Sequence, residues 1–154
     1  MKKSVLVTGA STGIGWQVSL MLANKGYQVF AGVRKSNDGE KLKTKNKAII
    51  PIIIDVTNSE QIHAAIKEIT AKHCDEFALI NNAGIATASP VETFPLKDLR
   101  QMFEVNYFGL VTTIQAFLPL LRTKKGRIVN ISSVAGLSSS PFLGGYSASK
   151  HAVE

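Results

Sequence analysis

The sequence predicts an α/β fold in which an open, parallel sheet carries helices on both faces. Short apolar runs alternate along the chain with longer segments of helical periodicity. The runs are nearly all apolar, which is typical of strands buried on both faces. A glycine-rich turn joins the first run to the first helical segment. With right-handed crossovers, this order favours a doubly wound sheet with strand order 3-2-1-4-5.

Five strands are expected from the apolar runs. They cover residues 4–7, 27–33, 48–54, 77–80 and 127–131. Helical spacing of apolar residues then predicts helices over 16–25, about 59–72, about 96–121 with a break near Asn106, and from Tyr146 onward. Gly26 is suited to end the first helix, and Asn58 or Ser59 to cap the second. Residues 34–47 read as a polar, lysine-rich connection.

The length predicts one domain over residues 1–154, expected to be the N-terminal portion of a longer one. The last four residues, 151–154, stop within a helical pattern without glycine, proline or a polar tail. The fifth strand would also be an unprotected apolar edge. We therefore expect further strands and a substrate region beyond Glu154, and a sheet that is incomplete in this chain.

Composition limits the classes of partner. The net charge is +7, from 18 Lys and Arg against 11 Asp and Glu. Much of the excess lies in residues 35–47, which could attract an anionic ligand or simply form a solvated basic loop. No aromatic residues interleave these lysines, so nucleic acid is not an expected partner.

Targeting and metal-binding signals are absent from the sequence. It has no signal-peptide pattern and no apolar run of membrane-spanning length. With Cys74 as its single cysteine, this predicts a cytoplasmic protein. The three histidines lack metal-ligand partners at suitable spacing, so no metal site is predicted.

The glycine-rich turn, residues 8–15, predicts a phosphate site. Gly9 allows a tight turn, Gly13 allows close approach of a pyrophosphate, and Gly15 allows helix and strand to pack. The following helix N-terminus offers free N–H groups to an anion. A purely structural turn is the alternative. The lysine of nucleotide-hydrolysing loops is absent, which disfavours NTP hydrolysis.

Ser133, Tyr146 and Lys150 form the sharpest catalytic pattern. Tyr146 and Lys150 are four residues apart and share one helix face, where an ammonium favours a phenolate. Ser133 follows the fifth strand, at the edge where such sheets bind ligands, and its hydroxyl can donate to a substrate oxygen. Taken singly, the tyrosine–lysine pair could be an ordinary surface pair and the serine a turn residue. Their conjunction with the glycine turn favours catalysis.

The end of the second strand bears on the choice of nicotinamide cofactor. An acidic residue there would bind the ribose 2′-OH of NAD, whereas an arginine would accommodate the 2′-phosphate of NADP. Residues 30–35 contain no acid, and Arg34 offers a planar fork suited to phosphate. The sequence therefore favours NADP(H), with NAD(H) as the alternative. A solvated arginine at the start of a loop is the non-functional interpretation.

These motifs give the chain a resemblance to the short-chain dehydrogenase/reductase family over essentially its whole length. The matching segments are the glycine turn 8–15, Asp55-Val56, Asn81-Asn82-Ala83-Gly84, Asn106 in Val105-Asn106-Tyr107, Ser133 in Ile131-Ser132-Ser133, and Tyr146-Ser147-Ala148-Ser149-Lys150. The resemblance implies a Rossmann-type fold and a catalytic tetrad of Asn106, Ser133, Tyr146 and Lys150. The predicted cofactor-binding residues are Gly9, Ser11, Thr12, Gly13, Ile14, Gly15, Arg34, Asp55, Val56, Asn82, Ala83, Gly84, Tyr146 and Lys150.

The resemblance also implies roles. Tyr146 would exchange a proton with a carbonyl or alcohol oxygen, Lys150 would favour its phenolate and bind the nicotinamide ribose, Ser133 would orient the substrate oxygen, and Asn106 would hold a relay water. Hydride would pass between the nicotinamide and a small carbonyl or alcohol substrate. Residues 91–94 and 138–145 most resemble steroid- or retinol-dehydrogenase-type members. Because its supporting shell would be missing, 1–154 alone is expected to be poorly stable and essentially inactive.

Two further expectations concern assembly and a rival function. In family members the helix from Asn106 to Leu121 often joins a dimer interface, so a homo-oligomer is expected. A non-catalytic dinucleotide-binding or sensor protein is the alternative function. Such relatives usually lose the tyrosine or the lysine, and this chain keeps both.

Overall fold

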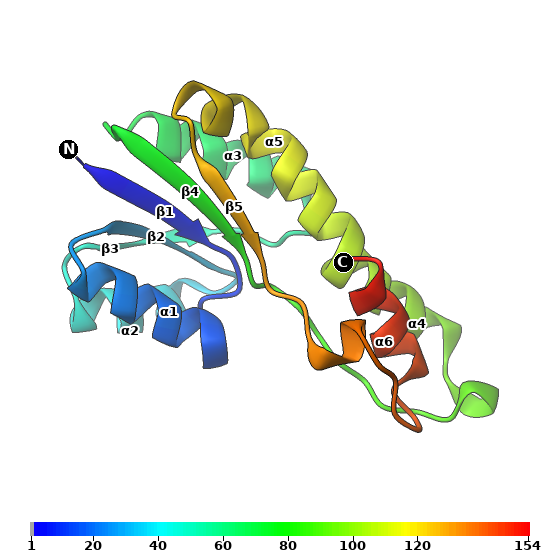
Figure 1. Cartoon of the computed structure of the whole chain (residues 1–154). Helices are drawn as coiled ribbons and strands as arrows, with labels where there is room; N and C mark the ends of the chain where they lie inside the picture. The colour runs from blue at the N-terminus through cyan, green and yellow to red at the C-terminus, as the bar shows by residue number, and fades with distance from the viewer. Residues whose placement is uncertain (1) are drawn as a thin grey trace.

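The computed structural model describes residues 2–154 and contains a five-stranded parallel sheet (Figure 1). The strands are β1 (Lys3–Val7), β2 (Gln28–Val33), β3 (Ile49–Ile53), β4 (Glu76–Asn81) and β5 (Arg127–Asn130). Their order is β3-β2-β1-β4-β5, and every neighbouring pair is parallel. The predicted fold class and strand order are both confirmed.

Residues 2–154 also contain six α-helices and three shorter helical segments, and of all these helical elements the last two in the chain follow β5. The α-helices are α1 (Gly13–Asn24), α2 (Ser36–Lys45), α3 (Ser59–Thr70), α4 (Leu96–Phe103), α5 (Gly109–Thr123) and α6 (Gly144–His151). The shorter segments are the 3₁₀ turns η1 (Val91–Thr93) and η3 (Val134–Gly136) and the π-helical turn η2 (Glu104–Phe108). Within the described part of the chain, no helix combines the length and apolarity needed to cross a bilayer.

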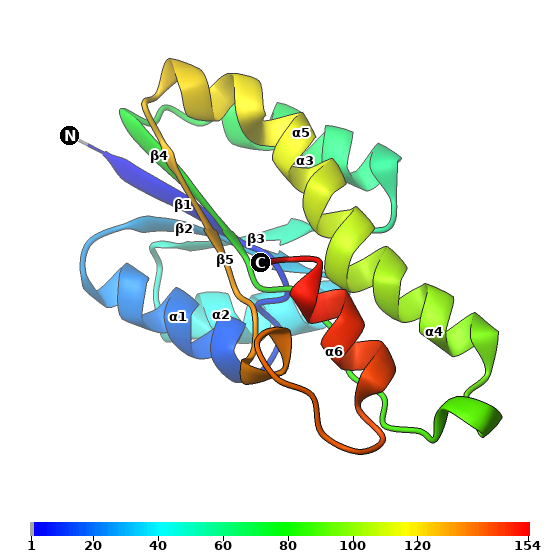
Figure 2. The ribbon, with the colours of Figure 1, turned by 45° about the vertical axis from the view of Figure 1, so that its right-hand side comes forward.

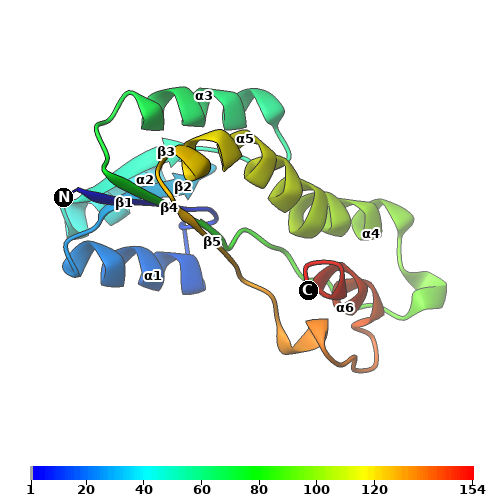
Figure 3. The ribbon, with the colours of Figure 1, turned by 45° about the horizontal axis from the view of Figure 1, so that its top comes forward.

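The sheet separates two apolar cores. On one face, side chains such as Leu6 and Phe30 pack with those of α3 and α5. On the other, alternate residues such as Val5 and Val29 pack with α1 and α2. Figure 3 shows α3 and α1 on opposite sides of the sheet. This two-faced burial explains why the central strands read as continuous apolar runs.

Residues 34–47 differ from the prediction, because most of this supposed connection is helix α2. Its only apolar residue is Leu42, which is fully buried, so the segment shows no apolar periodicity. A side chain at Gly39 would press on Pro51 of β3, which lets α2 lie close to the sheet. Asp38 near its start and Lys43 near its end complement the helix dipole.

The expected break near Asn106 is a π-helical turn inside a continuous rod. The backbone keeps helical angles from α4 through η2 into α5. A Cβ at Gly109 would lie 2.7 Å from a methyl carbon of Val56, so this glycine allows α5 to approach the segment after β3. Helix α6 packs against α4 and η2, as Figures 1 and 2 show. The π-helical turn therefore carries Asn106 on the side of the rod that faces α6.

Candidate functional site

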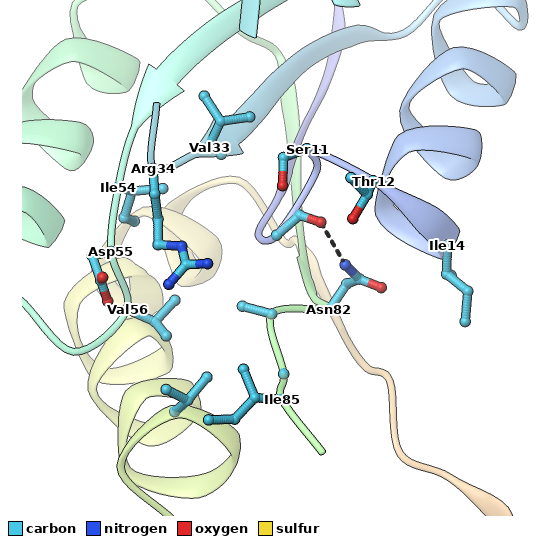
Figure 4. Close-up of a pocket in the computed structure, with 15 residues that line it drawn as sticks. Ser11, Thr12, Ile14, Val33, Arg34, Ile54, Asp55, Val56, Asn82 and Ile85 are labelled. Atoms are coloured by element: carbon cyan, nitrogen blue, oxygen red, sulfur yellow. Dashed lines mark hydrogen bonds between the residues drawn. The ribbon is translucent and has the colours of Figure 1, made fainter. Parts of the chain in front are cut away.

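A cavity of about 300 Å³ opens at the carboxyl ends of β1, β2 and β4 (Figure 4). Ligands bind at this edge in doubly wound sheets. The predicted cofactor residues that line it are Gly9, Ser11, Thr12, Ile14, Arg34, Asp55, Val56, Asn82, Ala83 and Gly84. Gly13, Gly15, Tyr146 and Lys150, also predicted to bind cofactor, are not among its lining residues. The structure thus brings together most of a set drawn from five separate segments.

The turn between β1 and α1 depends on its glycines in different ways. Gly9 and Gly13 have φ of +65° and +57°, in the left-handed region that favours glycine. A side chain at Gly13 would meet nothing within 4 Å, so this backbone is open to a ligand. Gly15 is buried, and a Cβ there would collide with the Gly9 carbonyl and lie 2.5 Å from Asn82 Nδ2. Gly15 therefore allows α1 to pack closely against the turn, whereas Gly13 leaves the backbone open to a ligand.

Asn82 and Thr8 clamp this turn to the end of β4. Asn82 Nδ2 donates to the carbonyl oxygens of Thr8 and Gly9, at 2.9 and 3.0 Å. In return, Thr8 Oγ1 accepts from the backbone N–H groups of Asn82 and Ala83, at 3.0 and 3.1 Å. The clamp pairs six polar groups internally, so hydrogen bonds within the protein fix the shape of the turn without a ligand.

Arg34 and Asp55 border the cavity opposite the glycine turn. Figure 4 shows the Arg34 guanidinium turned toward the cavity, across from Ser11 and Thr12. Arg34 is exposed and follows β2 directly. Asp55 Oδ1 accepts from the N–H and hydroxyl of Thr57, at 2.9 and 2.7 Å, which fixes the carboxylate at the rim. The two residues lie where a dinucleotide fold meets the adenosine part of its ligand.

Asn106 is held by hydrogen bonds on every side of its carboxamide. It is 1% exposed, at the centre of the π turn. Its Oδ1 accepts from the Ile85 N–H at 2.8 Å, and its Nδ2 donates to the Ile85 carbonyl at 2.9 Å and to Ser149 Oγ at 3.0 Å. Ile85 in turn lines the cavity. Asn106 therefore holds the Ile85 backbone, which borders the candidate cofactor site.

Lys150 is a buried cation near the end of α6. It is 5% exposed, and its Nζ donates to the Ile131 carbonyl, just beyond β5, at 2.9 Å. Burial lowers the pKa of Lys150 below its ordinary value, because desolvation penalises the ammonium form. A Cβ at Gly84 would lie 3.6 Å from Lys150 Nζ and 3.3 Å from Asn106 Oδ1. Because Gly84 has no side chain, no Cβ lies between the cavity and these two side chains.

Ser133 and Tyr146 flank the same region from η3 and α6. Ser133 Oγ accepts from the Ala135 N–H at 3.2 Å, which caps η3 and leaves the hydroxyl hydrogen available to a substrate oxygen. Tyr146 is half-buried on α6, one turn before Lys150. Helix α6 packs against η3, and a Cβ at Gly136 would lie 3.0 Å from the Lys150 carbonyl. The four residues of the predicted tetrad thus lie on η2, at the N-cap of η3 and on α6.

Comparisons with known proteins show which family this chain resembles. A family model described as short chain dehydrogenase matches residues 3–154. The probable short-chain type dehydrogenase/reductase VdlC of Helicobacter pylori is 43% identical over 153 residues, covering 97% of this chain and 55% of the relative. The NADPH-dependent 3-dehydrocapnine reductase of Ornithobacterium rhinotracheale is 38% identical over 157 residues, covering 97% of this chain and 56% of the relative.

A solved structure, ElxO with NADP bound, superposes with a TM-score of 0.92 at 32% identity, covering 99% of this chain and 64% of that one. The chain belongs to the short-chain dehydrogenase/reductase family. It spans about half the length of the curated relatives that it matches.

The sequence does not by itself predict two groups in this candidate site. It places Thr8 only within the turn, yet the Thr8 hydroxyl accepts hydrogen bonds from two backbone N–H groups. Ile85 was not singled out, although its N–H and carbonyl both bind Asn106. For Thr8 a signal existed, since a buried hydroxyl at a strand end needs a partner. The Ile85 contact joins backbone to a side chain 21 residues away and leaves no local pattern.

Replacing Gly15 with alanine should destabilise the glycine turn. The new methyl group would press on the Gly9 carbonyl and on Asn82, so the clamp must shift. We expect Gly15→Ala to lower the free energy of unfolding by about 1–3 kcal/mol, as overpacking does, and to weaken NAD(P)H binding. Urea unfolding and a fluorescence titration measure the two effects. Gly144→Ala, which meets only Val91 at 4.0 Å, is the control. Equal unfolding midpoints for the two variants would contradict this account of Gly15.

The lowered pKa of Lys150 predicts a pH-dependent stability. Between that lowered value and lysine's ordinary 10.5, the unfolded chain binds a proton that the folded chain does not. The stability of the wild type relative to Lys150→Met should therefore rise with pH through this window, and be lowest below it, where the buried ammonium is charged. Chemical unfolding at a series of pH values tests this. A difference that stays constant up to pH 10.5 would show that Lys150 titrates normally.

Proposed function

We propose that the protein is an NADP(H)-dependent oxidoreductase that transfers hydride between the nicotinamide and a carbonyl or alcohol carbon. The observation that carries the proposal is the direct connection between a preformed dinucleotide cavity and a buried tyrosine–lysine helix. Gly84 and Ile85 line the cavity, and the same backbone meets Asn106 and approaches Lys150. A ligand in the cavity would therefore reach the tetrad without any rearrangement of the sheet.

The residues present fit a dinucleotide. The open backbone at Gly13 and the N-terminus of α1 offer N–H groups to a pyrophosphate. Asp55 and Val56 would border the adenine, and Arg34 would meet the ribose 2′ position. When bound, the cofactor supplies or accepts the hydride. Lys150 would contact the nicotinamide ribose from α6.

Tyr146 would act as the acid–base group. In carbonyl reduction its phenolic hydrogen would pass to the substrate oxygen as the carbon accepts hydride, and in alcohol oxidation the phenolate would take that proton back. The neighbouring Lys150 ammonium would favour the phenolate electrostatically. The Ser133 hydroxyl would donate to the same substrate oxygen and orient it. Asn106, with Ile85, would border a relay water that returns the proton through Lys150.

The NADP(H) preference rests on charge at the cavity rim. Arg34 is exposed, turned toward the cavity, and stands where an NAD-specific site needs an acid. A guanidinium pairs with phosphate through charge-assisted hydrogen bonds. Relatives described as NADPH-dependent or bound to NADP support the same choice.

Tyr146→Phe should separate binding from chemistry. Tests belong in the full-length protein, meaning the complete product of the reading frame that contains residues 1–154. We expect kcat to fall about 10²- to 10⁴-fold, since a general acid is lost, while NADPH affinity stays within about twofold. A carbonyl panel with NADPH consumption measures the first, and a titration the second. Nucleotide binding without turnover by the wild type would favour a non-catalytic sensor instead.

Residues 1–154 alone should give little turnover. Ile128 and Val129 are 37% and 46% exposed and point to opposite faces of β5, so both faces of this edge strand are uncovered. Activity of this segment comparable to that of the full-length protein would contradict the expectation.

Arg34→Asp should reverse the cofactor preference. Losing a charge-assisted pair with the 2′-phosphate and adding repulsion should lower kcat/KM for NADPH relative to NADH by about 10- to 100-fold. Lys35→Asp is the matched control, because it makes the same charge change at an exposed neighbour outside the cavity lining. An unchanged NADPH/NADH ratio in Arg34→Asp would refute the assignment of Arg34.

A further inference from the structure

Helix α6 buries two serines that differ in their surroundings. Ser149 is 0% exposed, and its Oγ accepts from Asn106 Nδ2 at 3.0 Å and donates to the Tyr146 carbonyl at 2.7 Å. Ser147 is 3% exposed, and its Oγ has no hydrogen-bond partner among residues 2–154. The bond from Ser149 to Tyr146 lies within one helical turn, as is common for serine in helices. The bond from Asn106 is different, because it joins two elements.

The bond to Ser149 completes the hydrogen bonding of Asn106. An amide nitrogen carries two hydrogens, and Asn106 Nδ2 uses one for the Ile85 carbonyl and one for Ser149 Oγ. Its Oδ1 accepts from the Ile85 N–H. Removing the serine oxygen would leave one N–H of a side chain that is 1% exposed without an acceptor. The carboxamide would then be free to tilt away from its bidentate contact with Ile85.

Ser149 also connects the two sides of the site. Through Asn106 it reaches Ile85, which lines the cavity. Through its own hydroxyl hydrogen it reaches the backbone of Tyr146. This bridge fixes the spacing between the cavity floor and the helical turn that carries the phenol and Lys150.

We propose that Ser149 is a positioning residue that sets Asn106, and with it the cavity floor, against the catalytic turn of α6. The inference rests on the proposed function for its catalytic consequence. It assigns Ser149 no contact with substrate or cofactor, since its hydroxyl hydrogen is donated to the Tyr146 carbonyl and its oxygen accepts from Asn106.

The test compares Ser149→Ala with Ser147→Ala in the full-length protein. Each substitution removes one buried hydroxyl from the same helix, but only the first removes an acceptor of Asn106. Ser149→Ala should lower kcat about tenfold, the effect of weakening one positioned interaction, with the Kd for NADPH within about twofold. Ser147→Ala should leave kcat unchanged.

A double-mutant cycle separates positioning from general loss of structure. In an Asn106→Ala background, Ser149→Ala should cause no further loss of kcat, because the group through which Ser149 acts is gone. Equal losses in both backgrounds would overturn the proposal.

A second readout does not depend on turnover. Hydrogen exchange at the Ile85 amide, which donates to Asn106 Oδ1, should be about tenfold faster in Ser149→Ala and unchanged in Ser147→Ala. If the wild type shows no turnover, the proposed function fails, and the Ile85 exchange rate alone decides the Ser149 link. An Ile85 amide equally protected in all three proteins would overturn it.

Discussion

The hydrogen bonds between Thr8 and Asn82 are the constraint on which the candidate site depends. They close the turn after β1 onto the end of β4 with four bonds, in which Asn82 and Ala83 supply every donor and Thr8 and Gly9 every acceptor. In this closed form a Cβ at Gly15 would collide with the Gly9 carbonyl. Because Asn82 leads directly into Gly84 and Ile85, the same clamp sets where the backbone leaves the sheet for the tetrad.

Beyond Ile85, hydrogen bonds between polar groups hold the backbone and side chains of the candidate site in place. Asn106 binds both backbone groups of Ile85, and Ser149 binds Asn106 and Tyr146. The two halves of the site, glycine turn and catalytic helix, are thus linked by a chain of satisfied buried hydrogen bonds. Such networks specify one arrangement, since breaking any member leaves a desolvated polar group unpaired.

Lys150 places a different demand on the fold. A buried ammonium is costly unless its charge is compensated, and here its Nζ has the Ile131 carbonyl as a partner. That bond joins α6 to the segment just beyond β5. The cost of burying this ammonium is consistent with the role proposed for Lys150, because a cation with little solvent screening would act strongly on a phenol.

The sequence is sufficient to predict the sheet and the position of the glycine turn, because each produces a local sequence pattern. Buried parallel strands read as apolar runs, and Gly9 and Gly13 stand where the backbone takes positive φ. Helix α2 escaped prediction because Leu42 is its single buried apolar side chain. The contact between Asn106 and Ser149 spans 43 residues, so no window of sequence contains it.

The contrast between buried and exposed residues near the candidate site bears on the proposed substrate choice. The groups proposed to do chemistry are buried or half-buried. By contrast, the segment between Ser133 and Tyr146 has three largely exposed apolar side chains, with Val134 79%, Leu137 76% and Phe142 60% exposed. The free energy of the system falls when a partner or substrate removes such apolar side chains from water. If the proposed function holds, the reaction type would depend on the buried network, whereas substrate choice would depend on this exposed segment.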